Sequence, residues 1–130
     1  MTLERILAEQ AMRREIISIV SGAPMAIQIA AHTLLEAQED LAKAEAEVRR
    51  HRESIAAGVA AEKGEDGKPR YSNETARNAA IAMLMEESSD ADAVEVLRHT
   101  VRMATIQLQY EQDRFSAARA LARLLGYTDA

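Results

Sequence analysis

A seven-residue spacing of aliphatic side chains is the feature that most restricts how this sequence can fold. Between residues 24 and 61 it places Ile27, Leu34, Leu41, Val48 and Ile55. Three positions after each of these come Ala30, Ala37, Ala44, His51 and Gly58. Such a heptad places both rows on one face of a helix, which is typical of helices packed side by side. The spacing predicts a long helix over 24–61 with an alanine-rich seam.

A second heptad follows near the end of the chain. Its first row is Val94, Val101, Leu108, Phe115 and Ala122, and its second is Leu97, Ala104, Glu111, Ala118 and Leu125. Two long helices with matching seams are expected to fold back on each other as an antiparallel, coiled-coil-like hairpin. If Ile55 lies near Val94, His51 faces the region of His99, and Glu111 faces residue 39. These two polar seam residues either fix the register or form a polar pocket.

Glycine, proline and capping residues divide the rest of the chain. "SGAP" at 21–24 predicts a break that separates a first helix, 1–20, from the long helix. "KGEDGKPRYS" at 63–72 reads as a hinge, because Gly and Pro do not continue a helix comfortably. Ser72 or Asn73 then caps a short helix over 73–87. Its predicted inward face is Ala76, Ala80, Met83 and Leu84.

Composition favours an all-α fold in a single domain, 1–130, whose last helix is expected over 90–125. The chain is 48% hydrophobic but only 3% aromatic, so small aliphatic side chains must fill its core. Such a core suits closely packed helices. Two shorter helices cannot cover both faces of a long hairpin, so the apolar surface left over predicts a homodimer that completes the bundle.

The motifs of common enzymes are missing from the sequence. It has no cysteine, no Gly-x-Ser-x-Gly and no phosphate-binding loop of the Walker type. Glu47 precedes His51, and Glu95 precedes His99, by four residues rather than the three typical of metal sites in helical bundles. We therefore expect no catalytic residue, no metal and no cofactor, and a protein that is not an enzyme.

The sequence also predicts a cytoplasmic location. The longest apolar run, "APMAIQIAA", is too short to cross a bilayer. The first ten residues carry Glu4 and Arg5, whereas a signal peptide has a positive start and then an apolar stretch. We expect a soluble protein without a membrane partner.

Basic residues gather near the hinge end of the predicted hairpin. The candidate residues for binding phosphate or a partner are Arg49, Arg50, Arg52, Arg70, Tyr71, Arg98 and Arg102. Arginine forms bidentate contacts with phosphate, so the group suits a nucleic-acid backbone or a nucleotide. The alternative is a solvated face on which Glu45 pairs with Arg49 and Glu95 with Arg98. The net charge of −5 argues against nucleic-acid binding over the whole surface.

Residues 67–125, which begin "GKPRYSNETARNAAIAM", resemble a set of small helical proteins from bacteriophages and prophages. The shared pattern is Gly-Lys, a Tyr-Ser-Asn-Glu cap, a short Ala-rich helix, an acidic break and a long helix with an aromatic at a position like Phe115. The resemblance implies a helical interaction protein that binds a macromolecular partner in DNA replication or recombination. It implies no catalytic residue.

Two other functions stay open. One is direct nucleic-acid binding through the hinge-end arginines, which predicts an affinity that falls steeply with salt. The other is a nucleotide-binding or host-defence inhibitor role for the same arginines.

Overall fold

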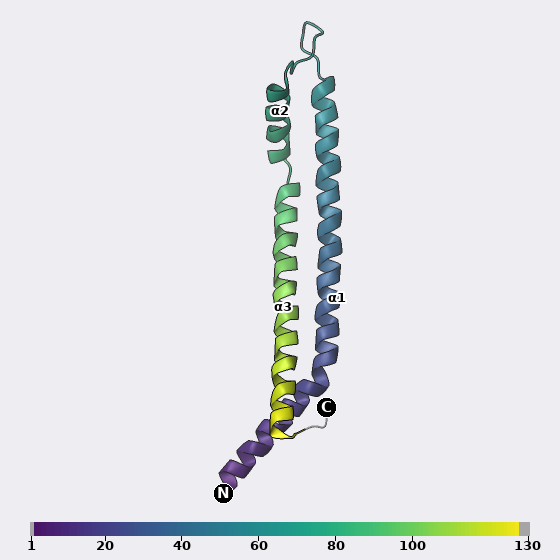
Figure 1. Cartoon of the computed structure of the whole chain (residues 1–130). Helices are drawn as coiled ribbons and strands as arrows, with labels where there is room; N and C mark the ends of the chain where they lie inside the picture. The colour runs from purple at the N-terminus through teal and green to yellow at the C-terminus, as the bar shows by residue number, and fades with distance from the viewer. Residues whose placement is uncertain (1, 128–130) are drawn as a thin grey trace. The chain divides into compact units, whose positions relative to one another are not determined.

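The computed structural model describes residues 2–127, and within them the fold is all-α. Its three helices are α1 (Leu3–Ala61), α2 (Glu74–Glu86) and α3 (Asp90–Leu125) (Figure 1). Between α1 and α2 lies an isolated antiparallel bridge, Lys63 to Pro69. Contacts between residues divide the chain into two units. Unit 1 holds 1–37 and 101–130, and unit 2 holds 38–100.

The break expected at 21–24 is wrong, because α1 continues through it as one helix with Pro24 inside. Pro24 has no N–H, so it removes one backbone hydrogen bond from the helix. The helix persists because Ala23 and Ala30 on either side are buried, and this burial offsets the lost bond. Figure 1 shows α1 changing direction within its first third, as a proline in a helix interior commonly causes.

In unit 1, α1 packs against the second half of α3 through small side chains. Ile16, Ala118 and Ala122 form a buried cluster that Ile19, Val20 and Tyr127 cover. Nearer the middle of the chain, Ala30 and Ala104 are also buried. Because alanine is small, buried alanines let the backbones of two helices approach closely. Small side chains are therefore enough to fill these seams.

The two heptads predict most of the buried positions. Every residue of the predicted rows on α3 is at least partly buried except Leu125, which is exposed. On α1 the exception is Gly58, and its neighbour Val59 is buried in its place. Both exceptions lie near a helix end. At the end of α1, Val59 belongs to the cluster that α2 covers.

In unit 2, α2 packs against the last turns of α1. Val59, Ala80 and Ile81 form the buried cluster, with Ile55, Ala56, Tyr71 and Met85 packed against it. The predicted inward face of α2 is right at Ala80 but wrong at Met83 and Leu84, which are exposed. Ile81 takes the buried position, so the buried face of α2 is rotated from the expected one.

The segment between α1 and α2 is a compact turn, as the hinge prediction requires. Gly64 N–H donates to the Lys68 carbonyl (2.8 Å), and Arg70 N–H donates to the Glu62 carbonyl (2.9 Å). Gly67 has φ +76°, a conformation that glycine adopts without strain. Asn73 Oδ1 then accepts the Ala76 N–H (2.7 Å) and caps α2.

The first half of α1 has an exposed start and a long apolar stretch. Residues 3–15 are helical, yet every one of them is exposed. Because α1 has no break at 21–24, it also contains an 18-residue window with a mean hydropathy of 1.4. By length and composition this helix could cross a membrane, a criterion that core helices of soluble proteins also meet.

Candidate functional site

Two of the predicted basic residues share a groove in unit 2. Arg49 on α1 and Arg98 on α3 line a cavity of about 320 Å³. Its other lining residues are Glu45, Val48, Ala91, Val94 and Glu95. The groove therefore has an apolar floor from the two seams and a rim of both charges.

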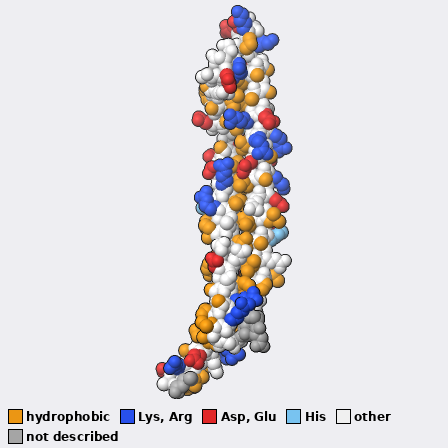
Figure 2. Space-filling view, in the orientation of Figure 1, with side chains coloured by type: hydrophobic (Ala, Val, Ile, Leu, Met, Phe, Trp, Pro, Cys, Tyr) orange, Lys and Arg blue, Asp and Glu red, His pale blue; other side chains and the backbone are white. Residues whose placement is uncertain are grey.

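The acidic residues on the rim compete with any anion for these arginines. Arg98 Nη1 donates to Glu95 Oε1 over 2.6 Å, one turn earlier on α3. Figure 2 shows acidic side chains interspersed with the basic ones on the visible face. An anion bound here would have to replace or share the Glu95 contact.

Arg70 and Tyr71 have a structural arrangement of their own beside the turn. Arg70 Nη1 donates to Glu62 Oε1 (2.5 Å), and its guanidinium lies 5.4 Å from the centre of the Tyr71 ring. The hydrogen bond to Glu62, and then the charge of Glu62, raise the pKa of Arg70 above its usual value. Tyr71 in turn packs against the cluster around Val59. The pair ties the turn to the end of α1.

The remaining candidates are exposed helix residues. Arg50 and Arg52 lie on α1 in unit 2, whereas Arg102 lies on α3 in unit 1. The structure thus brings Arg49 together with Arg98, and Arg70 with Tyr71. Binding of phosphate by these seven residues stays a prediction.

The facing rule used for the sequence is wrong by about one heptad in unit 2. His51 Nδ1 lies 2.8 Å from Asp90 Oδ2, at the first residue of α3, and not beside His99. Val48 likewise shares a groove with Val94, which the rule had placed beside Ile55. His51 therefore contributes to the register of unit 2.

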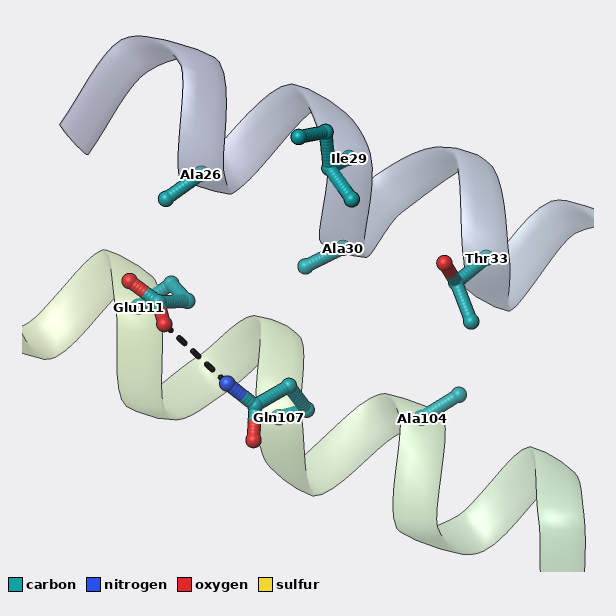
Figure 3. Close-up of a pocket in the computed structure, with 7 residues that line it drawn as sticks. All are labelled: Ala26, Ile29, Ala30, Thr33, Ala104, Gln107 and Glu111. Carbon is teal, nitrogen blue, oxygen red and sulfur yellow. Dashed lines mark hydrogen bonds between the residues drawn. The ribbon is translucent and has the colours of Figure 1, made fainter. Parts of the chain in front are cut away.

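Glu111 faces the first part of α1 and not residue 39. It lines a cavity of about 280 Å³ in unit 1, together with Ala26, Ile29, Ala30, Thr33, Ala104 and Gln107 (Figure 3). Glu111 Oε1 accepts a hydrogen bond from Gln107 Nε2 (3.0 Å) on the same helix. Within residues 2–127, no group of three or more His, Cys, Asp or Glu residues is placed to hold a metal ion. The cavity is an opening in an alanine-lined seam with one carboxylate at its edge.

The sequence reasoning missed a second apolar face on α3, which we call the outer row. Its residues are Val96, Met103, Tyr110, Ala117 and Leu124, with Ile106 and Leu121 beside them. Met103 is 50% exposed, Tyr110 56% and Leu124 81%. The row lies roughly opposite the seam, because a step of two residues from Val94 to Val96 turns a helix by about 200°. Its seven-residue spacing is the signal that could have revealed it.

Comparison of the chain with protein-family models, curated proteins and solved structures gave no match.

Proposed function

We propose that this chain is a non-enzymatic helical interaction protein that binds a macromolecular partner through the outer row of α3. One observation carries the proposal: α3 has two heptad faces, and among residues 2–127 the inner face is buried while the outer one is exposed. An exposed apolar row at heptad spacing suits another helix. A role in phage DNA replication or recombination completes the proposal, and its support is the resemblance of residues 67–125.

The same proposal includes a single long hairpin and a dimer. Within unit 1, residues around Ala30 meet α3 near Ala104, and those around Ile16 meet it near Ala118. Within unit 2, His51 meets Asp90. Both sets of contacts run in the antiparallel sense, which supports a continuous hairpin with a bundle completed by dimerisation.

Affinity capture with matched variants tests the interaction role. We expect a partner that wild type and Gln112→Glu both retain and that Tyr110→Glu loses. Gln112 is an exposed residue of the same helix outside the outer row, so the two variants add the same charge to different faces. If Tyr110→Glu captures every protein that wild type captures, and to the same extent, the proposed surface is wrong.

Phosphate binding through the groove of Arg49 and Arg98 is the second candidate, supported by the two guanidinium groups on one cavity. We expect DNA binding that weakens at least tenfold between low and moderate salt, because phosphate contacts release counterions. Replacing Arg49 and Arg98 by Ala should abolish it, while replacing Arg5 and Arg119, exposed in unit 1, should not. Unchanged affinity in the groove variant would reject this surface. A rise in the melting temperature of the protein with nucleotides, but not with DNA, would instead favour the nucleotide-binding role.

A further inference from the structure

The geometry points to a second copy of this chain as the occupant of the outer row, with the two α3 helices antiparallel. This inference rests on the interaction role proposed above and names the partner. It concerns residues 103–124 of unit 1. The pairing we propose places Asp113 of each copy beside Arg114 of the other.

The exposed area is the first support. The chain exposes 9676 Å², whereas a compact monomer of 14.3 kDa exposes about 6,800 Å². The excess, about 2,900 Å², is more than one protomer needs to contribute to a stable dimer, since interfaces commonly bury about 1,200–5,000 Å² over both partners. The outer row is where large apolar side chains contribute to this excess at heptad spacing.

Side-chain size across the two copies is the second support. When Asp113 faces Arg114, the antiparallel register places Tyr110 opposite Ala117, so a large side chain meets a small one. The same register places Ile106 opposite Leu121. Met103 then lies opposite Leu124, and these apolar pairs extend over about 30 Å of helix.

Charge supplies the third support and selects the direction. Asp113 is the acidic residue that interrupts the apolar strip, and its Oδ1 already accepts from Gln109 Nε2 (2.8 Å). Its other oxygen is left for a cation, and Arg114 of the second copy provides one in the antiparallel pairing. A parallel pair would place Asp113 beside Asp113, and like charges at an interface cost affinity.

Sedimentation equilibrium of the full chain provides the first test. We expect a dimer for wild type, and at least a tenfold weaker dimer for Met103→Glu and for Tyr110→Glu, because each places a carboxylate in the apolar strip. The matched controls are Thr105→Glu and Gln112→Glu, which are exposed on α3 outside the strip. Circular dichroism checks that every variant keeps the helicity of wild type.

Disulfide trapping gives a second test, which reports which residues of the two copies lie close together rather than how tightly the copies bind. The chain has no cysteine, so Tyr110→Cys and Ala117→Cys each introduce a single thiol. In the antiparallel register residue 110 of one copy lies opposite 117 of the other. Mixing the two variants should therefore give a covalent dimer at least tenfold faster than either variant gives by itself.

Four results would overturn the inference. A monomer at 100 μM, or equal dimerisation of Tyr110→Glu and wild type, would reject self-association through this row. Rapid trapping of Tyr110→Cys and of Ala117→Cys each by itself would reject the antiparallel register. A monomer that still captures another protein through Tyr110 would overturn this inference and leave the proposed interaction role intact.

Discussion

His51 Nδ1 on α1 and Asp90 Oδ2 at the start of α3 lie 2.8 Å apart, and each side chain is 39% exposed. Asp90 also sits in the first turn of α3, where the helix dipole favours a negative charge. The contact joins residues 39 apart in the chain. It is a polar contact that marks one register of the two seams in unit 2.

This contact predicts a measurable coupling. A double-mutant cycle with His51→Ala and Asp90→Ala should give a coupling energy of roughly 0.5 kcal/mol, held down by the partial exposure of both groups. His32 and Glu36 form a more exposed pair within α1, and the same cycle there should give about half as much. Chemical denaturation measures both. A coupling of zero for His51 and Asp90 would mean that the contact between helices adds nothing.

The proline inside α1 predicts a stabilising substitution. Pro24→Ala should raise the free energy of unfolding by about 1–3 kcal/mol, because alanine restores a backbone donor and has the higher helix propensity. Pro69→Ala is the control, since Pro69 lies in the turn and outside any helix. A melting curve followed by circular dichroism compares them. A loss of stability in Pro24→Ala would mean that the packing of unit 1 depends on the bend.

Close packing at the alanine seam predicts a penalty for larger side chains. Ala122→Leu should destabilise the chain by about 1–3 kcal/mol, because Ala122 is fully buried against Ile16 in unit 1. Ala31→Leu adds the same volume to α1, where the side chain is exposed. It should change stability by less than about 0.5 kcal/mol. Urea denaturation of the two variants measures whether the seam tolerates a larger side chain.

The cap of α2 predicts a local effect. Asn73→Ala should cost about 1 kcal/mol, because it removes the acceptor of the Ala76 N–H. Asn78→Ala, in the exposed interior of the same helix, should be neutral or slightly stabilising, since alanine has the higher helix propensity. Equal stability of both variants would show that α2 is held by its packing against Val59 rather than by its cap.

Long, periodic features of the sequence predicted the all-α character and the buried faces of the long helices. The heptads indicated the buried faces of α1 and α3, and Asn73, one of the two capping candidates, does cap α2. The break at Pro24 was wrong because a local signal competes with packing, and the buried Ala23 and Ala30 hold the helix together. Local chemistry does not contain that information.

The register and the second face were harder to predict for physical reasons. A heptad seam rich in alanine repeats nearly the same surface every seven residues, so a slip of one heptad changes little in packing. The His51–Asp90 contact distinguishes the registers, and a facing rule built on Ile55 and Val94 could not include it. The outer row stayed hidden because the inner row accounted for the same periodicity. Of the seven candidate site residues, Arg70 and Tyr71 are neighbours in the chain, but no local pattern signals that Arg70 pairs with Glu62.

The exposed first segment of α1 should be sensitive to proteases. Residues 3–15 are helical, yet none of their side chains is buried, and a helical segment of this length is marginal by itself. Trypsin should therefore cleave after Arg5, Arg13 and Arg14 well before it cleaves α1 after Arg49, because Ile16, Ile19 and Val20 belong to the core of unit 1. The first turns of α1 are therefore an extension that proteolysis can remove, and the packed part of the helix begins at Ile16.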